Sequence, residues 1–156
     1  MHVGKRLAHL LQAYGVTHVF GVPGGQTLAL YEGIMETPGI EHVLMRDERS
    51  AGYAADAYAR LTGYTGVCDA TVGPGATNLP SPLAEAYASS IPVVAIISDI
   101  PRGWEHLRVR GNASQGLRQL ERLGAIVDRR ELQPQRCAGD EPKAHLGPMG
   151  PQSPVL

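Results

Sequence analysis

Residues 40–60 read IEHVLMRDERSAGYAADAYAR, and this stretch contains the repeating unit of the fold. Its first part, Ile40–Met45, is a short apolar run with the length of a strand. Its second part, from Glu48 to Arg60, is rich in alanine and has the apolar spacing of a helix. The stretch therefore predicts a strand that leads directly into a helix, with Glu48 at the junction.

Alternating strand and helix patterns extend in both directions from this unit. Further strands are predicted at residues 18–22, 66–71 and 92–98, and further helices at residues 3–14, 27–35 and 83–87. This alternation, with continuous apolar strands, predicts an α/β protein with a mainly parallel sheet between two helical layers, a three-layer αβα fold. Pro80 suits a first helical turn, whereas Pro82 is expected to delay or distort the following helix.

The pattern weakens toward the carboxyl end. We expect one domain over residues 1–125 and a disordered tail over residues 126–156, where prolines and glycines are frequent and apolar residues are few. One further strand fits residues 123–127. An incomplete gene product or a shifted reading frame would produce such a tail.

Composition limits the classes of function. The 156 residues are 43% hydrophobic and 19% charged, which is typical of a globular α/β domain. The net charge is −1 and the basic residues are scattered, which argues against a nucleic-acid surface. No apolar run reaches membrane-spanning length and the first residues lack a signal-peptide core, so we expect a cytoplasmic protein. The six histidines have no metal-ligand spacing, and we expect no metal site in this chain.

Three loops follow predicted strands, at residues 21–26, 46–48 and 72–78. The carboxyl ends of parallel strands lie at one edge of a sheet, so these loops are expected to gather there. Their glycines, which permit positive φ and close approach of a ligand, are Gly24, Gly25, Gly73 and Gly75. Tight strand-to-helix turns need glycine in any α/β protein, however, and the loops lack dinucleotide and phosphate-loop signatures. Glycine content alone therefore does not identify a ligand.

Glu48 has two interpretations from its position. It is a carboxylate presented to a ligand at the edge of the sheet, or it is an acid that opens a helix. The second interpretation is common, because the dipole and the free N–H groups at a helix amino terminus favour negative charge.

Four segments taken together resemble one family. They are residues 20–25, 46–48, 54–63 and 73–78, and they occur in the order and spacing of the amino-terminal pyrimidine-binding domain of thiamine-diphosphate enzymes. The resemblance is to the group of acetolactate synthase and related 2-oxoacid decarboxylases, and it covers roughly residues 1–120. It implies a flavodoxin-like pyrimidine-binding domain.

The resemblance also implies the roles of individual residues. Glu48 would hydrogen-bond the ring nitrogen N1′ of thiamine diphosphate and so activate the cofactor for reaction with a 2-oxoacid. Asp47 departs from the family, where histidine often precedes the glutamate, and this affects the expected substrate preference. Gln115 would approach the substrate. The other cofactor-binding residues that the resemblance implies are Pro23, Gly24, Gly25, Gln26, Gly73, Pro74, Gly75 and Asn78.

The resemblance further implies that this chain supplies half of a site. Family members hold magnesium and the cofactor's diphosphate on a second domain, with a Gly-Asp-Gly segment and a downstream Asn that this chain lacks. We therefore expect a homo- or hetero-oligomer in which a partner subunit or domain carries the diphosphate site, and no catalysis by the chain alone. Two functions stay open: an enzyme component that supplies Glu48 to such a partner, and a non-catalytic fragment or interaction module derived from such an enzyme.

Overall fold

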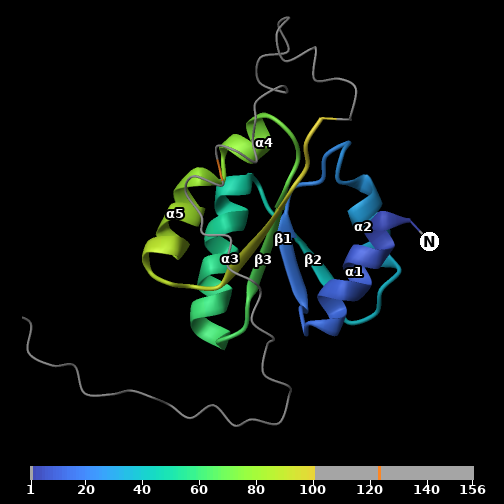
Figure 1. The fold of residues 1–156 in the computed structure, drawn as a ribbon, viewed down its shortest axis with the longest axis horizontal. Coiled ribbons are helices and arrows are strands. Elements are labelled where there is room, and N and C mark those ends of the chain that lie inside the picture. The colour runs from blue at the N-terminus through green and yellow to red at the C-terminus, as the bar shows by residue number, and fades with distance from the viewer. Residues whose placement is uncertain (1, 101–122, 124–156) are drawn as a thin grey trace, which may run out of the picture.

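A computed structural model describes residues 2–100 and Leu123 (Figure 1). Gln115 and the expected tail over residues 126–156 lie outside the described residues. The further strand considered for residues 123–127 is wrong at its first residue, because Leu123 is helical and buried; residues 124–127 are not described.

The described sheet has four parallel strands in the order β2-β1-β3-β4. The strands are β1 (His18–Gly21), β2 (Glu41–Leu44), β3 (Gly66–Ala70) and β4 (Val93–Ile97). The predicted parallel sheet is confirmed, and its order is that of flavodoxin-like folds. Successive strands are added to opposite sides of β1, so a crevice opens between the loops that follow β1 and β3.

Helices cover both faces of the sheet and complete the three predicted layers (Figure 1). On one face lie α1 (Val3–Ala13) and α2 (Leu28–Met35). On the other lie α3 (Glu48–Thr62), α4 (Pro74–Thr77) and α5 (Pro80–Ala88). None of the helices in the described ranges has the length and apolar content needed to cross a membrane.

Each face of the sheet has its own apolar core. Val19 and Val67 are buried under α1 and α2, whereas Cys68 and Ala70 are buried under α3 together with its Ala55. Neighbouring residues of β3 thus enter opposite cores, as expected for a strand that is covered on both faces. Burying a valine-sized side chain contributes about 1.5–3 kcal/mol to stability.

The predicted end of α1 is also confirmed. Tyr14 is the C-cap of the helix, and Gly15 follows with φ of 77°. This left-handed backbone conformation is the usual way to end a helix, and glycine adopts it without the steric penalty of a side chain.

Pro82 corrects an expectation from the sequence. The helix α5 begins at Pro80 and contains Pro82 as its third residue, so it is not delayed. The first N–H groups of a helix have no acceptor within it, so a proline there loses no hydrogen bond. Pro82 is fully buried against α3, where a Cβ on Gly52 would stand only 2.4 Å from the Pro82 Cγ. The glycine lets the two helices approach closely.

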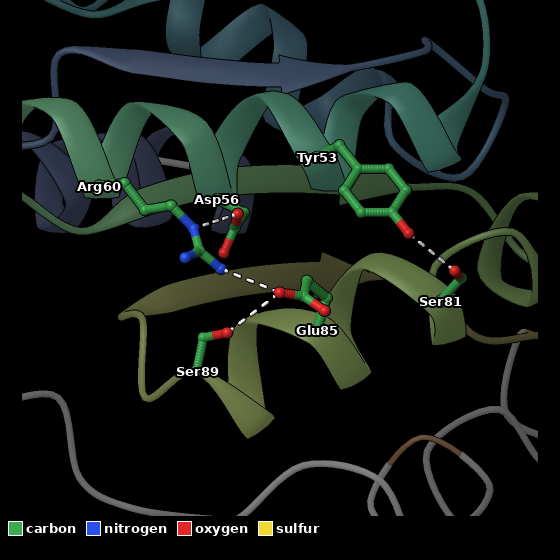
Figure 2. A network of polar contacts seen from close by, with 6 residues as sticks. All are labelled: Tyr53, Asp56, Arg60, Ser81, Glu85 and Ser89. Carbon is green, nitrogen blue, oxygen red and sulfur yellow. Dashed lines mark hydrogen bonds and ion pairs between the residues drawn. The ribbon is translucent and has the colours of Figure 1, made fainter. Parts of the chain in front are cut away.

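A polar network holds α5 against α3 (Figure 2). Arg60 donates from Nε to Asp56 over 2.7 Å and from Nη2 to Glu85 over 3.2 Å. Toward the amino-terminal ends of the two helices, the hydroxyl oxygens of Tyr53 and Ser81 are 2.9 Å apart. The Arg60–Glu85 pair is exposed and contributes about 1 kcal/mol or less, so its main effect is to fix the position of α5 along α3.

Candidate functional site

The loops that follow the adjacent parallel strands β1 and β3 contact each other at the carboxyl edge of the sheet. Thr71, the first residue after β3, donates from Oγ1 to Oε1 of Gln26 over 2.9 Å. A Cβ on Gly24 would stand 2.4 Å from the Thr71 Cβ, so this contact requires glycine. Thr71 therefore joins the two loops. Sequence reasoning missed it, because Thr71 was the last residue of a predicted strand and no motif distinguished it from the other strand residues.

Glu48 joins the same cluster from the start of α3. Asn78 donates from Nδ2 to Glu48 Oε2 over 2.9 Å. The other oxygen, Oε1, lies beside Gly75, where a Cβ would be only 3.0 Å away. One carboxylate oxygen is thus held by an amide, and the other lies beside a residue without a side chain.

Asp47, and not Glu48, caps the helix α3. Its Oδ1 accepts from the backbone N–H of Ser50 over 2.8 Å, and its Oδ2 accepts from the Ser50 hydroxyl over 2.9 Å. These hydrogen bonds lower the pKa of the Asp47 carboxyl. A side-chain cap of this kind satisfies the free end of a helix, so the Glu48 carboxylate remains available for contacts with Asn78.

The loop glycines are required for different structural reasons. The positive φ that the sequence permits at four glycines occurs only at Gly73, where φ is 70°. Gly24 and Gly75 are instead needed because Thr71 packs against both of them. A Cβ on Gly25 would meet no atom within 4 Å in the described structure, so the chain is open at that point.

A second carboxylate is buried beneath the site, on the α1–α2 face of the sheet. Asp69 of β3 is fully buried, and the Tyr31 hydroxyl lies 2.8 Å from its Oδ1 and 2.9 Å from its Oδ2. Space for the carboxylate comes from Gly21 on the adjacent strand, where a Cβ would overlap Oδ1. The sequence signal for Asp69 was an acid within an apolar strand, but no motif drew attention to it.

The pKa of Asp69 reflects this burial. Burial is the main cause that raises the pKa to about 6; the negative charge of Glu48 acts in the same direction and the Tyr31 hydrogen bond opposes it. Burial also raises the pKa of Tyr31 and lowers that of His42, whose ring packs edge-on against Tyr31 with centroids 4.4 Å apart. Asp69 therefore has a neutral donor but, among the residues described, no cation to balance its charge.

The remaining candidates lie around this cluster. Pro23 is exposed in the first loop, and Pro74 is exposed as the first residue of α4. Gln115 is outside the described residues. Within the described ranges no group of histidine, cysteine or acidic side chains could hold a metal ion. A carboxylate with one oxygen held by an amide and the other beside a glycine can accept a hydrogen bond from a flat nitrogen heterocycle.

Comparison with known proteins identifies the family. The family model described as "Thiamine pyrophosphate enzyme, N-terminal TPP binding domain" matches residues 1–122. An acetolactate synthase of Mycobacterium bovis is 52% identical over 93 residues, which cover 60% of this chain and 15% of that protein. The acetolactate synthase isozyme 2 large subunit of Escherichia coli is 50% identical over 100 residues, 64% of this chain and 18% of that protein. A probable 2-ketoarginine decarboxylase of Pseudomonas aeruginosa is 46% identical over 106 residues, 65% of this chain and 19% of that protein.

The chain thus spans less than a fifth of the length of each of these relatives. The family match nevertheless covers most of the chain and includes every described strand, helix and loop of the site. The chain therefore belongs to the thiamine pyrophosphate enzymes, and residues 1–122 correspond to their N-terminal TPP-binding domain.

Proposed function

We propose that this chain supplies the cofactor-activating half of a thiamine diphosphate site in an acetolactate-synthase-like or 2-oxoacid-decarboxylating enzyme. Glu48 is the proposed catalytic residue, and its carboxyl group shares a proton with the ring nitrogen N1′ of the aminopyrimidine. The other half of the site, which binds the diphosphate through magnesium, belongs to another domain or subunit of the same assembly.

The observation that carries this proposal is the contact between Glu48 and Asn78. An acid that opens a helix accepts hydrogen bonds from the N–H groups of that helix. In α3 this role is taken by Asp47, so it does not explain the position of Glu48. The Glu48 carboxylate is instead held by an amide from a loop thirty residues further along the chain. A carboxylate oriented across two loops at the ligand edge of a parallel sheet is typical of a binding role.

The described residues fit an aminopyrimidine at this place. Gly75 places no side chain of its own against Glu48 Oε1, and a Cβ on Gly25 would meet no atom within 4 Å, which leaves open space in the first loop. When bound, thiamine diphosphate supplies the nucleophilic carbon and the electron sink for removal of carbon dioxide from a 2-oxoacid. The task of Glu48 is to share a proton at N1′, and the task of Asn78 is to hold the carboxylate in place. The other residues proposed to border the cofactor are Pro23, Gly24, Gln26, Gly73 and Pro74.

The test is Glu48→Gln in the chain assembled with a subunit that carries the diphosphate domain. The glutamine can still accept from Asn78 through its oxygen, so the fold is preserved, but its amide cannot take up a proton from N1′. Turnover of the 2-oxoacid should fall about 10²- to 10⁴-fold, the usual contribution of a general acid–base group.

Glu36→Gln is the matched control. Glu36 is the exposed C-cap residue of α2 and pairs with Lys5 at 2.6 Å, so its replacement by glutamine should leave turnover unchanged. Near-normal turnover in assembled Glu48→Gln would mean that Glu48 is only a helix-start residue.

A further inference from the structure

Thr71 contacts three parts of the site at once. Its Oγ1 donates to Gln26, its Cβ lies against Gly24, and its Cγ2 is 2.9 Å from the place where a Cβ on Gly75 would stand. Gly75 in turn borders Glu48 Oε1. The side chain of Thr71 is therefore packed between two glycines, with its hydroxyl directed at the loop after β1.

The Thr71 hydroxyl decides which end of the Gln26 amide is available to a ligand. The amide oxygen is occupied by the hydroxyl, whereas the two N–H donors of Nε2 lie on the opposite branch of the planar amide. In the part of the chain that the structure describes, Nε2 donates to no other group. Gln26 is exposed, so these donors face the surroundings of the loop.

We propose that Thr71 is a positioning residue that holds Gln26 so that its Nε2 donates to the carboxylate of a bound 2-oxoacid. This inference rests on the proposed function and names the group of the substrate that Gln26 recognises. An ionised carboxylate only accepts hydrogen bonds, so it requires a donor. Glu48, on the other side of Thr71, would repel the substrate carboxylate, and this makes a donor at Gln26 more important.

Two substitutions separate the hydrogen bond of Thr71 from its packing. Thr71→Val preserves the shape that packs on Gly24 and Gly75 but removes the hydroxyl. Thr71→Ser keeps the hydroxyl but removes the Cγ2 methyl that packs on Gly75. A positioning role through the hydrogen bond makes valine the damaging change, whereas a packing role makes serine the damaging change.

The first measurement uses the full chain alone, without cofactor. Nitrogen-15 relaxation of the Gln26 side-chain amide, assigned by its loss in Gln26→Ala, reports how firmly the amide is held. We expect an ordered amide in the unaltered chain and in Thr71→Ser, and a mobile amide in Thr71→Val. Equal mobility in all three proteins, or a mobile amide only in the serine variant, overturns the proposal.

The second measurement uses the chain assembled with its diphosphate-bearing subunit. Thr71→Val should raise KM for the 2-oxoacid roughly 3- to 10-fold, as expected for the loss of one neutral hydrogen bond, and change kcat less than about twofold. Thr71→Ser should restore KM. A lower kcat at unchanged KM overturns the proposal. Glu48→Gln acts on kcat instead, and the amide measurement needs no activity, so failure of this inference is distinguishable from failure of the proposed function.

Gln26→Met keeps the proposal testable if Thr71→Val does not fold. Gln26 is exposed, so its replacement should not affect folding. In the assembled enzyme, Gln26→Met should raise KM for the 2-oxoacid and change kcat little, because methionine has no N–H to donate to the carboxylate. An unchanged KM would overturn the proposal.

Discussion

Asp69 holds its carboxylate inside the sheet with a tyrosine hydroxyl as its donor. Burial of a carboxylate without a cation favours the protonated form, and this is why its pKa rises from 3.8 to about 6. The group therefore destabilises the fold wherever it must be ionised. Below the unfolded pKa both states hold the proton and the penalty is absent; it grows as pH rises through the window between the two pKa values.

Replacing Asp69 with asparagine should remove this pH dependence. The amide oxygen can still accept from Tyr31, and no charge is buried. Relative to the unaltered chain, Asp69→Asn should gain stability between about pH 4 and pH 6, approaching about 3 kcal/mol at neutral pH. Urea unfolding of both proteins at several pH values measures the gain.

The control makes the same chemical change at an exposed acid. Asp47→Asn replaces a carboxyl whose pKa is lowered by hydrogen bonds from Ser50, so its contribution is present above the unfolded pKa and is lost as pH falls. The asparagine variant should therefore be less stable than the unaltered chain by an amount that does not change between about pH 4 and pH 6 and that disappears as pH falls below about 4. A pH-independent difference between Asp69→Asn and the unaltered chain would contradict the burial argument.

At single residues, sequence reasoning singled out Glu48, Gly75 and Asn78, which the structure brings together, but not Thr71 or Asp69. A charged residue at the start of a helix stands out in a linear pattern, and so do glycine turns. Thr71 and Asp69 are recognised only by their contacts with residues distant in the sequence, Gln26 and Tyr31 respectively. Such contacts depend on which strands become neighbours, and no local signal in the sequence records that.

The packing of α5 on α3 depends on the pair formed by Gly52 and Pro82. A Cβ on Gly52 would stand 2.4 Å from Cγ and 2.7 Å from Cβ of Pro82, and a proline ring has no flexible end that could move aside. Gly52→Ala should therefore push α5 away from α3. The expected loss of stability is about 1–3 kcal/mol, despite the better helix propensity of alanine.

Pro82→Ala in the same chain provides the cross-check. Removing the ring relieves part of the overlap, so the double variant should lose less stability than the two single variants together. Denaturant unfolding of the four proteins gives the coupling. Strict additivity would mean that the helices are not held at this contact.

At the scale of elements, the sequence predicts strands and long helices well and boundaries less well. Amphipathic spacing was sufficient for α1, and continuous apolar runs were sufficient for the strands. The start of α5 was placed too late, because proline was judged by its effect within a helix rather than in a first turn. Pro82 was compatible with the helix because Gly52, thirty residues earlier, leaves room for its ring.

For the whole molecule, the prediction concerns binding of thiamine diphosphate. The described residues offer the cofactor a carboxylate and an amide at its pyrimidine end, and no acidic cluster that could hold magnesium at its diphosphate end. A polypeptide of these 156 residues should therefore bind thiamine diphosphate weakly. Calorimetric titration with cofactor and magnesium should give little heat.

The comparison for this titration is the same chain assembled with the diphosphate-bearing subunit, which should bind much more tightly. A dissociation constant of about a micromolar or lower for the chain alone, roughly −8 kcal/mol, would contradict the half-site proposal. Fold class and family followed from the ordered set of segments in the sequence, because three of them lie at the ends of neighbouring parallel strands and the fourth, residues 54–63, lies in α3 and its C-cap. The arrangement of subunits could not be predicted in the same way, because it depends on contacts with a second chain or domain.

The thiol of Cys68 can report when the buried face of the sheet becomes exposed to solvent. It lies in β3, fully buried beneath α3, and burial raises the pKa of its thiol to about 12. Thiol reagents react with thiolate, so Cys68 is inert while the sheet stays closed. In a chain whose other cysteine, Cys137, is replaced by serine, the labelling rate of Cys68 measures how often α3 separates from β3. The reactivity of this buried thiol thus makes local opening of the domain measurable as a rate.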